Sequence, residues 1–141
     1  MGYDGASIYC SSKFALEGWS ESLYKELERF GIYAVLVEPG YFNTDFLDTS
    51  SVSYGDIKIE DYVPSSDEKK AVLDAHSHNQ LGDPAKLGAA LLKLAEMEKP
   101  PARYTAGSDA LQELLTKAET LRSVAEEWRE LTISTDGSKA A

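Results

Sequence analysis

The chain has 141 residues, and 43% of them are hydrophobic, which is enough for one packed domain and excludes a disordered segment. Its 14 Lys+Arg and 24 Asp+Glu give a formal net charge of −10, so we expect it to bind neither nucleic acid nor a membrane surface. The single cysteine excludes an internal disulfide, and the chain shows neither a signal-peptide pattern nor a membrane-length apolar run, so we expect a cytoplasmic location.

The first predicted element is an amphipathic helix over residues 7–30. Its apolar residues recur every three or four positions, so they share one helical face. Ser7 is the expected N-cap, and Gly31 is the expected C-terminal stop. The apolar face consists of Leu16, Trp19, Leu23, Leu27 and Phe30.

A strand is predicted next, over residues 32–39. The run IYAVLV is apolar without alternation, which is typical of a strand buried on both faces of a parallel sheet, and Pro39 with Gly40 ends it. Residues 47–82 are polar and too many for a plain connection. We therefore expect them to form a flap over a substrate, with a short helix near residues 67–79.

Residues 83–131 are predicted to form C-terminal helices separated by a short strand. Asp83 is the expected N-cap of the first helix, and a proline follows it in the first turn. The short strand is expected over residues 102–106, and Asp109 is the expected cap of the last helix. The tail over residues 132–141 is expected to be frayed.

Tyr9 and Lys13 are the first candidate catalytic residues. They are four positions apart at the start of the first helix, so both side chains leave the same face one turn apart. A free phenol ionises only near pH 10, but a nearby cation favours the phenolate. The pair can therefore transfer a proton to or from an alcohol or a carbonyl group.

The spacing of this pair is weak evidence by itself. Tyr54 and Lys58 have the same spacing, but Gly55 disfavours a helix between them, so nothing orients that second pair. An incidental pair on a helix surface is the alternative interpretation of Tyr9 and Lys13. No metal site is expected, because the two histidines are only two positions apart and would point in different directions on a helix.

Three segments together resemble the short-chain dehydrogenase/reductase family, whose members are NAD(P)-dependent oxidoreductases. They are YCSSKFALEGWSESLYKEL, GIYAVLVEPG and YFNTDF. The resemblance continues through DPAKLGAALLKL and RYTAGSDA, and so it covers nearly the whole chain. It implies an α/β fold, namely the C-terminal half of a doubly wound Rossmann-type parallel sheet.

The resemblance also implies roles for individual residues. Tyr9 corresponds to the family's general acid/base, and Lys13 corresponds to the lysine that binds the nicotinamide ribose and favours ionisation of the tyrosine. The implied reaction is hydride exchange between NADP or NAD and a small apolar alcohol or ketone. The remaining implied cofactor contacts follow the strand, where the turn abuts the nicotinamide and the next residues hold its carboxamide: Pro39, Gly40, the backbone at Phe42, and the Thr44 hydroxyl.

One part of the family pattern has no counterpart in these 141 residues. The family begins with a strand and a Gly-rich turn that binds the pyrophosphate, and its catalytic serine precedes the tyrosine. We therefore expect this chain to be inactive by itself, and to form homo-oligomers or to associate with the missing half. The alternative is a truncated, non-catalytic remnant that acts as an interaction module.

Overall fold

A small parallel sheet forms the centre of the computed structural model, which describes residues 1–48, 50–53, 55 and 59–137. Within that part of the chain the sheet has two strands, β1 (Leu36–Pro39) and β2 (Arg103–Ala106). They pair in register from Leu36↔Arg103 to Pro39↔Ala106. A parallel pair needs a crossover connection, and the 63 residues between the two strands, 40–102, supply it.

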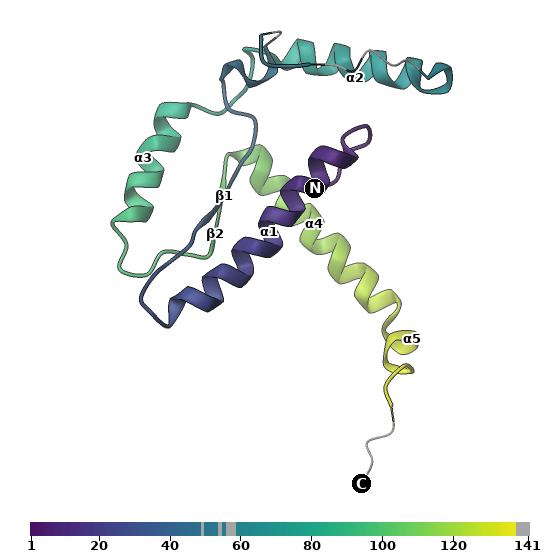
Figure 1. Ribbon diagram of the computed structural model, residues 1–141. Coiled ribbons are helices and arrows are strands. Elements are labelled where there is room, and N and C mark those ends of the chain that lie inside the picture. The colour runs from purple at the N-terminus through teal and green to yellow at the C-terminus, as the bar shows by residue number, and fades with distance from the viewer. Residues whose placement is uncertain (49, 54, 56–58, 138–141) are drawn as a thin grey trace.

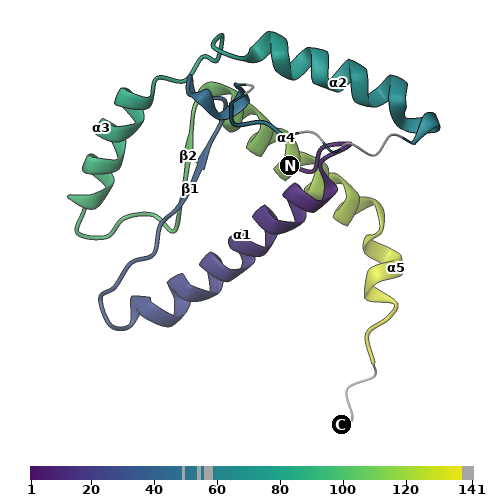
Figure 2. The ribbon, with the colours of Figure 1, turned by 45° about the horizontal axis from the view of Figure 1, so that its top comes forward.

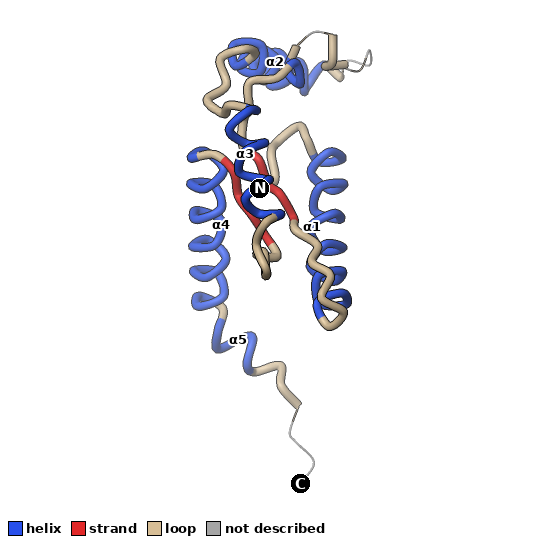
Figure 3. The backbone as a smooth tube through the Cα atoms, turned by 90° about the vertical axis from the view of Figure 1, so that its left-hand side faces the viewer, coloured by secondary structure: helices blue, strands red, loops and turns tan. Residues whose placement is uncertain are grey.

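Helices cover both faces of this sheet (Figures 1 and 2). The helices α1 (Ser7–Glu28) and α4 (Ser108–Glu127) lie on one side of the strands and α3 (Pro84–Ala95) lies on the other in Figure 1, and Figure 3 looks onto the sheet with α3 in front. This layering is the predicted α/β class with a parallel sheet.

The first helix differs from its predicted span at both ends. α1 begins at Ser7, but the N-cap position belongs to Ala6, which makes no side-chain cap bond. Ser7 is already helical, and its carbonyl accepts a hydrogen bond from the Ser11 hydroxyl, so its prediction as N-cap is wrong. The helix ends at Glu28 rather than at residue 30, and Gly31 stops it with a left-handed φ of 69°.

The predicted strand over residues 32–39 is twice as long as β1. The pairing begins at Leu36, whose N–H donates to the Ala102 carbonyl at 2.9 Å, because β2 offers no residue further back in register. Ile32 is 54% exposed, so the expectation of burial on both faces is wrong for the start of this run. An apolar run shows where a strand can form, whereas its partner decides where the strand begins.

The helix in the predicted flap begins and ends earlier than expected. α2 (Val63–His76) begins before residue 67, because Pro64 is well tolerated in a first helical turn. Lys69 Nζ contacts Asp4 Oδ2 at 2.5 Å, which ties α2 to the segment before α1. Two short 3₁₀ helices, η1 (Asp45–Leu47) and η2 (Glu60–Tyr62), precede α2. None of the described helices combines the length and apolar character needed to cross a membrane.

The C-terminal region contains α3, β2, α4 and α5 (Arg129–Ile133). Asp83 caps α3 as predicted, since its Oδ1 accepts from Ala85 N at 2.8 Å. Asp109 does not cap α4, whose N-cap is Gly107. The predicted tail over residues 132–141 begins inside α5, and residues 138–141 lie outside the described part of the chain.

A charged cluster fastens α1 to the sheet. Arg103 Nη1 lies 2.5 Å from Glu38 Oε1 on the neighbouring strand and 3.5 Å from Glu17 Oε2 on α1. All three side chains are at most one-third exposed. The cluster therefore fixes the helix that carries Tyr9 against the strand that ends at Pro39.

Candidate active site

Tyr9 and Lys13 lie on the first two turns of α1, on the same face. Lys13 Nζ stands 5.4 Å from the centroid of the Tyr9 ring, close enough for a cation–π contact. The Tyr9 side chain is exposed, so a substrate can reach its hydroxyl. The predicted pair is therefore assembled, with the positive charge beside the phenol.

The second tyrosine-lysine pair, Tyr54 and Lys58, lies outside the described residues. The predicted lack of orientation of this pair therefore stays a prediction.

The start of α1 lies at the same end of the sheet as the carboxyl ends of both strands (Figure 1). The start of α4 also reaches this end, and α2 lies beyond it. Ligands of open parallel α/β sheets bind at the carboxyl ends of the strands. The location of Tyr9 and Lys13 is therefore that of a binding site in this type of fold.

The turn after β1 is held from two directions. Gly40 N donates to the Ala106 carbonyl at 2.8 Å, which continues the sheet pairing by one residue. Tyr41 N donates to Asp109 Oδ2 at 2.7 Å, which joins the turn to the first turn of α4. Pro39 is exposed, so its ring offers a flat apolar surface beside this turn.

The segment after the turn pairs with the end of the flap. Phe42 forms a parallel bridge with Gly82, and Asn43 N donates to the Gly82 carbonyl at 2.8 Å. The Thr44 hydroxyl is the N-cap of η1, where it accepts from Phe46 N at 3.4 Å and donates to the Phe42 carbonyl at 3.5 Å. Both contacts lie at the long end of the hydrogen-bond range, so they hold the hydroxyl weakly.

The structure brings three further residues into contacts around this end of the sheet: Tyr3, Tyr41 and Glu113. The Tyr3 hydroxyl donates to Glu113 Oε2 on α4, so the segment before α1 is tied to α4. The Tyr41 ring lies 5.8 Å from the His76 ring of α2. No spacing rule relates these residues, because the contacts join four separate segments.

Burial and negative charge shift two of these tyrosines in the same direction. Burial raises the pKa of Tyr41, and the carboxylates of Glu113 and Asp109 and the phenol of Tyr9 raise it further. Burial also raises the pKa of Tyr3, together with its hydrogen bond to Glu113. Both phenols therefore stay protonated at neutral pH and can donate hydrogen bonds.

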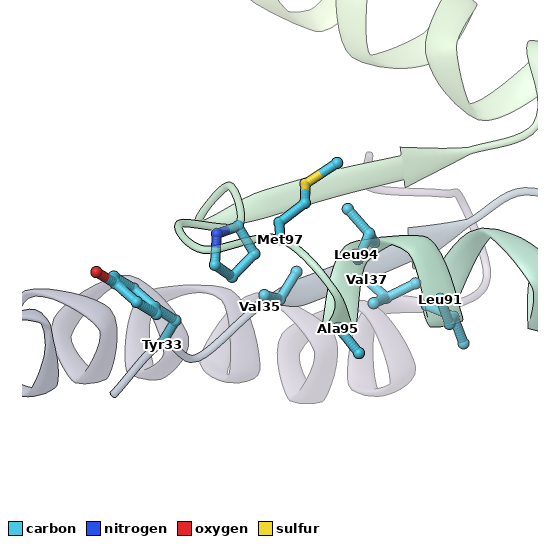
Figure 4. Close-up of a pocket in the computed structure, with 8 residues that line it drawn as sticks. Tyr33, Val35, Val37, Leu91, Leu94, Ala95 and Met97 are labelled. Carbon is cyan, nitrogen blue, oxygen red and sulfur yellow. The ribbon is translucent and has the colours of Figure 1, made fainter. Parts of the chain in front are cut away.

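An apolar pocket lies on the opposite face of the sheet. Its volume is about 400 Å³, and it lies between the β1 segment and α3 (Figure 4). Because α1, which carries Tyr9, lies on the other side of the strands and lines no part of this pocket, the pocket does not adjoin Tyr9. Its lining residues are Tyr33, Val35, Val37, Leu91, Leu94, Ala95, Met97 and Pro100.

Fold and site together define an α/β unit of the Rossmann type, with its candidate site at the carboxyl ends of parallel strands. A family model described as short chain dehydrogenase matches residues 1–54. A solved short-chain dehydrogenase from Streptomyces avermitilis superimposes with a TM-score of 0.80 at 33% identity, over 97% of this chain and 49% of that one.

Curated relatives give the same result. A 3-ketodihydrosphingosine reductase of Bacteroides thetaiotaomicron is 38% identical over 107 residues, which are 76% of this chain and 39% of that protein. Human retinol dehydrogenase 16 is 31% identical over 121 residues, covering 72% of this chain and 35% of the relative. The chain belongs to the short-chain dehydrogenase/reductase family, and it spans less than half the length of these relatives.

Proposed function

We propose that Tyr9 is the general acid/base of an alcohol–ketone oxidoreduction and that Lys13 supplies the positive charge that favours its phenolate. The observation that carries this proposal is the position of Lys13 Nζ, 5.4 Å from the Tyr9 ring centroid, on one face of α1. In the reductive direction the Tyr9 hydroxyl donates its proton to the carbonyl oxygen. In the oxidative direction the phenolate removes the proton from the alcohol.

The cofactor proposed for this site is NADP or NAD, which members of the family use. When bound, the nicotinamide would donate or accept the hydride. The Lys13 ammonium, on the same face of α1 as Tyr9, can donate to ribose hydroxyls, and the exposed ring of Pro39 can contact a flat heterocycle. The Phe42 backbone and the Thr44 hydroxyl would hold the carboxamide. The long contacts of that hydroxyl support this role, because it can exchange them for a stronger partner.

The proposed substrate is a small apolar alcohol or ketone. The names of the relatives support this class, since one is a reductase of a keto compound and another is a dehydrogenase of retinol. The aromatic ring of Tyr41 also supports it, because it is exposed and close enough to Tyr9 for the two phenols to interact.

The test compares two tyrosine-to-phenylalanine variants of the full-length protein. Tyr9→Phe removes the transferable proton and should lower kcat by about 10²- to 10⁴-fold while the affinity for the nucleotide changes little. Tyr24→Phe removes a hydroxyl from the same helix, beside Tyr33 and 15 residues further along, and should keep normal turnover. Equal turnover in both variants would show that Tyr9 does not transfer the proton.

The second candidate function is a non-catalytic interaction module. It is supported by apolar side chains that remain exposed on and after α1, such as Trp19 at 61% and Phe30 at 65%. They are suited to contact with a second copy or with another chain. If the parent protein shows no turnover while Trp19→Ser abolishes its self-association, the interaction role replaces the catalytic one.

A further inference from the structure

The turn that follows β1 is held by a side chain of α4, 68 positions further along the chain. The Asp109 carboxylate accepts from Tyr41 N through Oδ2, at 2.7 Å. It also lies directly over the glycine that precedes Tyr41. A Cβ atom added to Gly40 would stand 2.2 Å from Asp109 Oδ1, well inside the closest distance that such atoms adopt.

This close approach explains the glycine at position 40 without any ligand. Gly40 is not among the glycines with a left-handed φ, so its backbone angle does not require glycine. The space where its side chain would be is instead filled by the Asp109 carboxylate. A larger residue could be accommodated only if the carboxylate moved away, and the carboxylate would then lose its hydrogen bond to Tyr41 N.

Asp109 does not cap α4, although its position in the first turn suggests that role. An aspartate in the first turn of a helix often caps that helix, but the N-cap of α4 is Gly107, and α4 has no side-chain cap bond. A negative charge near the N-terminus of α4 is favourable for the helix dipole. The hydrogen bond of the Asp109 carboxylate goes to the turn after β1.

We propose that Asp109 is a positioning residue, which fixes the Pro39–Gly40–Tyr41 turn so that the groups assigned to the nicotinamide keep their places relative to Tyr9. The proposal rests on the proposed function, since that function gives the turn its role. The contact itself stands apart from that function, and its effect on stability can be measured without any turnover.

The first experiment is a double-mutant cycle on Gly40 and Asp109, read by thermal unfolding of the full chain at fixed concentration. Gly40→Ala and Asp109→Ala should each lower the midpoint, because each removes the bond to Tyr41 N. In the Asp109→Ala background, Gly40→Ala should lower it by less than half as much as in the parent chain. Gly107 is unsuitable for this cycle, because its φ of 102° would strain any side chain.

Glu119→Ala is the matched control for the cycle. It removes a carboxylate that pairs with Arg122 on the exposed surface of α4, ten residues beyond Asp109, so its effect should simply add to that of Gly40→Ala. Additive effects for Asp109→Ala as well would overturn the proposed contact. Non-additivity confined to Asp109 supports it, whatever the activity of the protein.

The second experiment separates positioning from mere folding. Asp109→Asn keeps an acceptor oxygen for Tyr41 N, whereas Asp109→Ala does not, so the KM for NADPH or NADH should rise about tenfold in Asp109→Ala and be largely restored in Asp109→Asn. The kcat at saturating nucleotide should change less than the KM. Equal KM values in the parent and Asp109→Ala would overturn the positioning role. Loss of turnover in Tyr9→Phe reports only on the proposed function, so failures of the two proposals are distinguishable.

Discussion

Arg103 is the residue whose loss should most weaken the attachment of the catalytic helix to the sheet. Its guanidinium bonds Glu38 at 2.5 Å and lies 3.5 Å from Glu17, with exposed side-chain fractions of 33%, 24% and 29%. The second carboxylate oxygen of Glu38 is buried and has no hydrogen-bond partner among the described residues. Arg103→Met keeps the length and apolar stem of the side chain but leaves both carboxylates without their cation.

The size of the effect follows from the partial burial of the cluster. Exposed ion pairs contribute about 0–1 kcal/mol, whereas breaking a fully buried pair costs about 3–5 kcal/mol. A hydrogen bond to a charged group contributes about 1.5–3 kcal/mol. For this intermediate case we expect Arg103→Met to lower the free energy of unfolding by about 2 kcal/mol. Glu17→Gln should cost about 0.5 kcal/mol or less, because its distance to Arg103 is long.

Urea unfolding followed by circular dichroism, at one protein concentration, measures this difference. With an m-value of about 2 kcal/mol/M, the midpoint of Arg103→Met should fall by roughly 1 M while the slope stays unchanged. Arg122→Met is the control, because Arg122 pairs with Glu119 on the exposed surface of α4. If the two variants unfold at the same urea concentration, the Arg103 cluster contributes no more than a surface pair and the reasoning fails.

Three further outcomes are expected. Gly82→Ala should destabilise the fold by about 1–3 kcal/mol, because its Cβ would stand 2.6 Å from the Phe42 ring. Gly88→Ala lies inside α3 with open space for a Cβ, so it should stabilise the fold by about 0.5–1 kcal/mol; the urea midpoints of both variants test this. Hydrogen bonds from Ser50 lower the pKa of Asp48 from 3.8 to about 2. The stability that the ionised carboxylate contributes is therefore present above pH 4 and is lost as the pH falls to 2. In acid unfolding curves, Asp48→Asn should not lose stability in this range. The edge of β1 away from β2 has no neighbour among the described residues, so light scattering should show a mass that rises with concentration, and a constant monomer mass would contradict this.

Elements with local signals could be predicted from the sequence. Asp83 and the proline after it identify the start of α3, and Gly31 identifies the end of the helical region of α1, because caps and stops act within a few residues. The length of β1 could not be predicted in this way. Its first residue is set by its register with β2, 67 residues further along the chain, and no property of the IYAVLV run encodes that limit.

The candidate site likewise combines residues that local spacing could identify with residues whose contacts depend on the fold. Tyr9 and Lys13 could be identified because one helical turn brings their side chains together, and that geometry follows from their spacing alone. Tyr3 and Glu113 could not, since their contact joins residues that are 110 positions apart. Asp109 was visible in the sequence as a helix cap, and its actual partner, Tyr41, is 68 positions away.

Gly40 shows how one residue can satisfy two requirements that the sequence does not distinguish. A glycine after a strand predicts a close approach to the backbone, and the family resemblance assigns that approach to a nicotinamide ring. In the fold, the nearest group is a carboxylate from α4, which bonds the next amide and fills the space above the glycine. A turn that is held by its own protein needs no ligand to keep its shape, so its geometry is set before a nucleotide binds. Pre-organisation by Asp109 and contact with the ring on the exposed side of Pro39 are therefore compatible, because they use different sides of the same turn.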